Sequence, residues 1–118
     1  MKETALQRKS KAFAVRIIKM YQYLCEEKKE YVLSKQVLRS GTSIGANTHE
    51  GFYAQSRADF ISKLSVALKE SSETSYWLTI LYKTDIINGE MFHSLKKDVD
   101  EIIRIIISTV KTAKKNAE

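Results

Sequence analysis

Residues 39–52 combine the composition of a loop with the spacing of a helix. Glycine and serine are frequent there, yet no proline interrupts the stretch. The inward positions in and just before it recur at helical spacing on one face: Leu33, Val37, Ile44 and Thr48. A glycine inside a helix costs about 1 kcal/mol relative to alanine, so Gly41 and Gly45 need a compensating reason, usually the close approach of another backbone. We therefore predict a continuous helix that packs tightly against a neighbour.

The rest of the chain also favours helices over strands. None of the 118 residues is proline and only four are glycine, which argues against a fold with many turns. A chain of this length is long enough to bury a core as one domain. We predict a single domain over residues 1–118, with helices at residues 5–28, 31–54, 57–85 and 90–114. Short connections make neighbouring helices antiparallel, so the expected fold class is all-α, an up-down-up-down four-helix bundle.

Local signals mark the breaks between these helices. Residues 26–29 form a charged turn, and Ser56 begins a capping box with Asp59 in the acidic position. Asn88 or Gly89 is expected to cap the last helix.

The sequence favours a reducing, non-membrane location. Cys25 is the only cysteine, so no intrachain disulfide can form. The first residues lack an apolar signal segment, and the most apolar run, residues 102–107, is interrupted by Arg104 and is too short to span a bilayer. We expect a cytoplasmic protein.

Two of the predicted helices have more apolar surface than one bundle stripe requires. In the third helix, Phe60, Leu64, Ala67, Ser71, Thr74, Leu78 and Tyr82 form the inward stripe. A second apolar face of that helix comprises Val66, Trp77, Ile80 and Leu81. The last helix leaves Ile105 and Ile107 on the flanks of its own stripe. Such surplus faces indicate either deeper burial or a subunit interface, and we predict an interface formed by Val66, Trp77, Ile80, Ile105 and Ile107.

The net charge of +6 is unevenly distributed. A basic stripe runs along the first helix, away from its core face: Arg8, Lys9, Lys11, Arg16 and Lys19. A second group gathers near the end of the chain: Lys111, Lys114 and Lys115. A basic excess attracts polyanions, so these eight residues are the candidate nucleic-acid contacts. Aromatic stacking adds little, because only Tyr23 and Tyr53 are expected outside the core.

Enzyme signatures are missing or have unsuitable geometry. Glu90 and His93 have the spacing used by di-iron bundles, but such sites need two of these pairs and further glutamates. Ser43 and His49 project in different directions from one helix, so they do not form a nucleophile and base. Gly41 and Gly45 match a membrane dimer motif, but charged and polar neighbours favour close packing in a soluble bundle. We expect no catalytic residues, metal site or cofactor.

A longer pattern around the glycines resembles a known family. The matching residues are Arg39, Ser40, Thr42, Ser43, Ile44, Gly45, Ala46, Asn47, Glu50 and Gly51, followed by Asp59, Phe60, Lys69, Glu70, Glu73, Tyr76, Trp77 and Leu78. This pattern is similar to that of the 23S rRNA intervening-sequence protein family, also called S23-type or four-helix-bundle proteins. Thr48 departs from it, because an aliphatic residue is more usual at that position.

Within this pattern we assign helix packing to Arg39, Ser40, Gly41, Ser43, Gly45, Asn47, Glu50 and Gly51. Glu70 and Glu73 share the second face of the third helix, so we predict that they are partly buried; the alternative is that they are surface acids near a rim. A partly buried carboxylate needs a partner, and the resemblance makes Arg39 the candidate for both. Asn47 is expected to hydrogen-bond the backbone of a neighbouring helix.

The resemblance implies assembly into a ring, commonly a pentamer, and gives two functional associations. Members are linked with intervening sequences of rRNA genes, and related accessory proteins of diversity-generating retroelements engage a reverse transcriptase and its RNA. We predict a non-catalytic, ring-forming scaffold that binds structured RNA or another nucleic acid through basic surfaces. The alternative is a protein–protein adaptor ring that presents helices to a partner enzyme and has no nucleic-acid contact.

Overall fold

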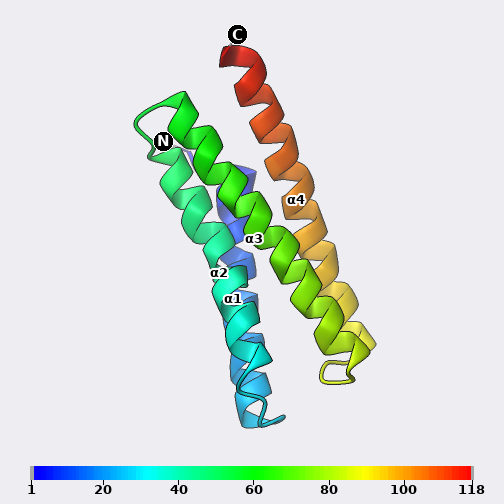
Figure 1. The fold of residues 1–118 in the computed structure, drawn as a ribbon. Helices are drawn as coiled ribbons and strands as arrows, with labels where there is room; N and C mark the ends of the chain where they lie inside the picture. The colour runs from blue at the N-terminus through cyan, green and yellow to red at the C-terminus, as the bar shows by residue number, and fades with distance from the viewer. Residues whose placement is uncertain (1, 118) are drawn as a thin grey trace.

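The computed structural model describes residues 2–117, which form four helices and no strands. They are α1 (Ala5–Glu26), α2 (Leu33–Phe52), α3 (Arg57–Lys83) and α4 (Gly89–Ala117). Each helix packs against the next one in the chain, and α4 returns to contact α1 more lightly. Both ends of the chain lie at the same end of the bundle as the link between α2 and α3 (Figure 1). The all-α, antiparallel four-helix fold is as predicted.

The helix ends differ from the sequence prediction by up to three residues, and backbone geometry explains the ends of α1 and α3. After α1, Lys29 adopts a left-handed conformation with φ of 52°, and after α3, Asp85 does so with φ of 61°. Such a residue terminates a right-handed helix, so α1 and α3 end earlier than predicted. Asn88, rather than Gly89, caps α4 by accepting the Met91 N–H at 2.8 Å.

The start of α2 is held by a carboxylate that lies before the helix. Glu30 accepts the backbone N–H groups of Val32, Leu33 and Ser34 at 3.1, 3.0 and 2.7 Å. Burial alone raises the pKa of Glu30, but these backbone donors outweigh it and leave the pKa lowered. The carboxylate therefore satisfies N–H groups that the helix itself cannot.

The glycines of α2 lie in continuous helix against α1, as predicted. A Cβ added to Gly45 would stand 3.2 Å from the backbone carbonyl oxygen of Ser10. A Cβ added to Gly41 would stand only 2.8 Å from two side-chain carbons of Ile17. Both positions therefore let α1 and α2 approach more closely than any larger residue would allow.

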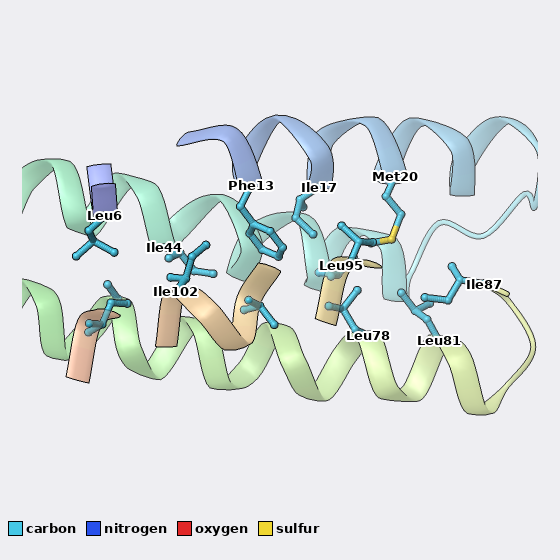
Figure 2. Packing of buried hydrophobic residues seen from close by; sticks show 14 of the residues in the cluster. Leu6, Phe13, Ile17, Met20, Ile44, Leu78, Leu81, Ile87, Leu95 and Ile102 are labelled. Atoms are coloured by element: carbon cyan, nitrogen blue, oxygen red, sulfur yellow. The ribbon is translucent and has the colours of Figure 1, made fainter. Parts of the chain in front are cut away.

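The core contains one apolar stripe from each helix. Phe13 and Ile17 of α1 meet Ile44, Leu78 and residues of α4 along the bundle axis (Figure 2). Leu81 was predicted to lie on the second apolar face of α3, and that prediction is wrong. Leu81 is fully buried, because it follows Leu78 by three residues and shares its inward stripe. Tyr82, predicted to point inward, is partly exposed and stacks on Phe92.

Two buried threonines differ in how their hydroxyls are satisfied. Thr74 lies 2.9 Å from the Ser40 hydroxyl across the α2–α3 interface, and 2.8 Å from the Glu70 carbonyl oxygen. Thr48 is equally buried, but its hydroxyl has no hydrogen-bond partner among the described residues. This is the position where the sequence departs from the family pattern.

Candidate subunit and nucleic-acid interfaces

A charged cluster joins the outer edges of α2 and α3. Arg39 of α2 donates to Glu70 of α3 at 3.2 Å and to Glu73. Glu73 also accepts the indole N–H of Trp77 at 3.0 Å. The side chains of Glu70 and Glu73 are 14% and 31% exposed, so both carboxylates are partly buried as predicted. The pairing that the family resemblance implied is present in the structure.

Hydrogen bonds shift the pKa values of two members of this cluster, Arg39 and Glu73. The pKa of Glu73 is lowered, first by the Trp77 indole donor and then by Arg39. The pKa of Arg39 is raised, chiefly by its hydrogen bond to Glu73. These bonds favour the charged forms of Arg39 and Glu73, and the bond from Glu73 holds the Trp77 ring against the surface of α3.

An apolar surface lies beside the charged cluster on α3. It consists of Val66, Tyr76, Trp77 and Ile80, which we call the α3 apolar surface. Val66 is 39% and Tyr76 57% exposed, whereas Trp77 and Ile80 are half-buried. The rings of Tyr76 and Trp77 meet edge to face with centroids 5.1 Å apart. All four side chains lie within about one quarter of the helix circumference, but Val66 is about 15 Å from Tyr76 along the axis, with Glu70 and Glu73 between them on that face. The exposed patch that a partner can cover is therefore centred on Tyr76, Trp77 and Ile80.

Ile105 and Ile107 do not join this surface. Ile105 lies in a hollow beside Glu101, whose carboxylate bonds Lys9 of α1, so Ile105 is on the α1 side of α4. Ile107 is exposed and lies about 200° further round the same helix. The α3 apolar surface borders α2, whereas α4 packs on the opposite side of α3. The five residues expected to share one interface thus occupy separate faces of the chain.

Three of the five basic residues predicted on α1 are in ion pairs. Lys9 bonds Glu101 at 3.0 Å and Arg16 bonds Asp98 at 2.6 Å, both across the α1–α4 interface. Lys11 bonds Glu3 on its own side of the bundle. Arg8 and Lys19 are exposed and have no ion pair among the described residues. The α1 stripe is therefore less available to a polyanion than its sequence indicated.

The basic residues of α4 are exposed and lie beyond the end of α1. In the antiparallel pair, Lys9 is level with Glu101, so α1 begins at Ala5 level with Ile105. Lys111, Lys114 and Lys115 follow that level and are all exposed, with no ion pair among residues 2–117. Figure 1 shows the last turns of α4 standing clear of the other helices. The structure does not bring these lysines together with the α1 stripe into one patch.

The remaining motif residues stabilise α2 and its contact with α3. Glu50 bonds Lys63 at 3.1 Å, and Gly51 lies against the side chains of Lys63 and Leu64. Asn47 donates to the Ser43 carbonyl oxygen of its own helix at 2.9 Å, so the predicted bond to a neighbouring helix is wrong. Its side chain is long enough to reach the preceding turn, which satisfies it locally.

The serine and histidine side chains considered as catalytic candidates are Ser43, His49 and His93. Ser43 donates its hydroxyl to the Arg39 carbonyl oxygen, while His49 and His93 are exposed. Among the described residues, no three His, Cys, Asp or Glu side chains gather as metal ligands would. None of the helices within residues 2–117 has the length and apolar character needed to cross a bilayer.

The protein is an antiparallel four-helix bundle. Glycines bring α1 and α2 together, and a charged cluster joins α2 to α3. The 23S rRNA-intervening sequence protein family model matches residues 2–108, and the chain belongs to that family. It is also similar to a crystal structure from Bacteroides thetaiotaomicron, a protein of unknown function from the S23 ribosomal protein family. The identity is 53%, the TM-score is 0.90, and the match covers 91% of this chain and 99% of that one. Comparison with curated proteins gave no match.

Proposed function

We propose that this protein is a non-catalytic, self-assembling scaffold that binds structured RNA through exposed basic residues. The observation that carries the proposal is the lysine-rich end of α4, where Lys111, Lys114 and Lys115 are exposed, unlike the paired Lys9 and Arg16. Charge-based contacts with phosphates position a nucleic acid without reading its sequence. We therefore expect weak sequence selectivity and a strong dependence on salt.

Assembly strengthens this proposal because it would repeat the same lysines in every subunit. A net charge of +6 per chain is modest, but several copies held in one ring act together through avidity. The α3 apolar surface is the best-supported subunit contact, because its partly exposed aromatic and aliphatic residues surround a fixed Trp77. A pentameric ring remains the expectation from the family resemblance.

The experiment that tests RNA binding compares two triple variants of equal charge change. One is Lys111→Glu, Lys114→Glu and Lys115→Glu. The other reverses exposed lysines toward the opposite end of the bundle: Lys28, Lys35 and Lys97. Binding of a labelled RNA hairpin is measured by fluorescence anisotropy over a range of salt. We expect the α4 variant to lose about ten-fold or more in affinity and to show a shallower salt slope, while the control changes much less.

The α1 residues need separate treatment because their charges also hold the bundle together. Reversing Lys9 or Arg16 would place like charges against Glu101 or Asp98 and disturb the α1–α4 contact. Arg8 and Lys19 can be reversed without this side effect, and we expect a smaller loss of RNA affinity from that pair.

The second candidate function is the adaptor ring, which the α3 apolar surface favours. The adaptor function becomes the better explanation if the assembled protein retains no RNA at low salt. The same holds if the two triple variants lose RNA affinity equally. In that case the α3 apolar surface would be the place to look for a protein partner.

A further inference from the structure

A cleft of about 670 Å³ opens at the end of the bundle, between the end of α4 and the link from α2 to α3. Its walls include Phe52 at the end of α2, Arg57 and Phe60 at the start of α3, and Thr112 and Ala113 of α4. The cleft has the size of a small-molecule site, for which volumes of about 300–1,000 Å³ are typical.

The cleft exists because the buried core stops before the helices do. The last fully buried residue of α4 is Ile106, and the first of α3 is Leu64. Beyond that layer, α3 and α4 diverge toward this end of the bundle (Figure 1). The α4 wall there is made of small polar or short residues, including Ser108, Thr112 and Ala113, which leave the space between the helices unfilled.

The groups that line the cleft favour an anionic aromatic ligand. The lining contains Arg57, several hydroxyl groups and the amide of Asn116, and none of its residues within 2–117 carries a carboxylate. Phe52 and Phe60 meet edge to face with ring centroids 5.2 Å apart, and both are half-buried. Arg57 is exposed and has no ion pair among the described residues. The cleft therefore offers a cation, hydrogen-bonding groups and an aromatic wall together.

Two lysines of α4 extend this positive character along the rim. Lys111 follows the lining residue Ser108 by three positions, and Lys115 likewise follows Thr112, so each is its neighbour on the helix surface. Lys114 lies on the far side of α4, about 200° round the helix from Thr112. Lys111 and Lys115 are one turn apart on the same side of α4, so a phosphate that leaves the cleft on that side would meet them before Lys114.

We infer that this cleft binds an unpaired nucleotide of an RNA strand, with the base against Phe52 and Phe60 and a phosphate at Arg57. The inference rests on the proposed RNA binding and adds a site within it. In a duplex the bases are stacked and paired, so their faces cannot enter a cleft in a protein surface. An unpaired base has a free face for an aromatic side chain and a flexible phosphate on each side. The preferred ligand is therefore a loop, bulge or strand end.

The test fills the cleft without changing its charge. Ala113→Leu adds bulk to the α4 wall outside the buried core, and Ser72→Leu adds similar bulk at an exposed site on α3 as the matched control. Fluorescence anisotropy measures two RNAs at one salt concentration, a short unpaired strand and a fully paired duplex. We expect Ala113→Leu to lower the affinity for unpaired RNA by about ten-fold and to leave the affinity for duplex RNA unchanged, since stacking one base typically contributes that much. Ser72→Leu should change neither.

A charge variant checks the phosphate contact. Arg57→Gln should also weaken the unpaired strand selectively, and Lys115→Gln should weaken it more than Lys114→Gln. Circular dichroism verifies that each variant keeps the helicity and melting temperature of the parent. Two results would overturn the inference. In the first, Ala113→Leu binds unpaired RNA with the affinity of the parent protein. In the second, its affinities for duplex and unpaired RNA fall equally. Neither result would change the separate outcome of the triple-lysine test, which compares charge-reversal variants through their hairpin affinity and salt slope.

Competition identifies the form of the ligand. An unlabelled strand should displace the labelled one at similar concentrations, whereas adenosine 5′-monophosphate should need far higher concentrations because it lacks the flanking phosphates. Equal potency of the mononucleotide would assign the cleft to free nucleotides and overturn the RNA assignment. Displacement by a glutamate-rich peptide as effectively as by RNA would instead assign it to an acidic protein segment.

Discussion

The contrast between Thr48 and Thr74 gives the sharpest prediction of stability. Both side chains are fully buried in the same bundle, at 0% exposure. Only Thr74 has partners for its hydroxyl, namely Ser40 and the Glu70 carbonyl oxygen, whereas Thr48 has none among the described residues. Valine has nearly the shape of threonine and a similar helix propensity, so Thr→Val at each site changes little besides the hydroxyl.

The two substitutions should have opposite effects on the free energy of unfolding. A buried hydroxyl without a partner carries a desolvation cost of about 1–3 kcal/mol, so Thr48→Val should stabilise the fold by up to that amount. A satisfied hydrogen bond contributes about 0.5–1.5 kcal/mol net, so Thr74→Val should destabilise it by roughly that amount. For a domain of this size, each 1 kcal/mol corresponds to a shift of about 4 °C in Tm.

Urea unfolding followed by circular dichroism measures both changes at one protein concentration, because assembly would make stability concentration-dependent. Thr48→Ser is the control, since it keeps the hydroxyl and removes a buried methyl group, and should destabilise by about 1 kcal/mol. Loss of stability in Thr48→Val, with an unchanged slope against urea, would show that the Thr48 hydroxyl is satisfied and refute the reasoning.

Three further substitutions test other parts of the structure. Glu30→Gln should weaken the start of α2 by about 1 kcal/mol near neutral pH. Because the folded pKa of Glu30 is lowered, its contribution is complete above the ordinary value of 4.5 and should fade as pH falls below it, which urea unfolding at several pH values can follow. Gly45→Leu should cost about 1–3 kcal/mol or more by overpacking against the Ser10 backbone, and an unchanged Tm would contradict the close contact. Trp77→Ala should reduce the mass measured by light scattering while keeping helicity, since a buried interface tryptophan can contribute several kcal/mol to association; a parent protein that is monomeric at micromolar concentration would remove the basis for that prediction.

Local features of this fold were predictable from the sequence because they depend on spacing within one helix. The period of the apolar residues predicts the helices, and the cost of Gly41 and Gly45 predicts a close neighbour. The pairing of Arg39 with Glu70 and Glu73 came from the family resemblance, since charge alone does not specify which residues on two helices meet. The Glu30 cap was missed because the side chain lies before the helix and Val32 occupies the usual capping position.

The partners of the α1 basic residues could not be predicted in the same way. Lys9 and Glu101 are 92 residues apart in the chain, and their contact depends on how far α4 is shifted along α1. A shift of one helical turn moves each residue by about 5.4 Å and would separate these pairs. The cleft depends likewise on the divergence of α3 and α4, which follows from the extent of the core and not from any motif.

The ion pairs between α1 and α4 have a consequence for the proposed RNA binding. A guanidinium or ammonium group that bonds a carboxylate has part of its charge neutralised and some of its N–H donors occupied, which lowers its contribution to phosphate affinity. Lys9 and Arg16 therefore serve the bundle first, and the proposed RNA contacts rest on basic residues without an ion pair among those described: Arg8, Lys19, Arg57 and the lysines at the end of α4. The lysines of α4 follow residue 108, where the match to the family model ends. The α4 lysines proposed to contact phosphate thus lie outside the matched residues, whereas Arg8, Lys19 and the proposed nucleotide cleft at Phe52, Arg57 and Phe60 lie within them.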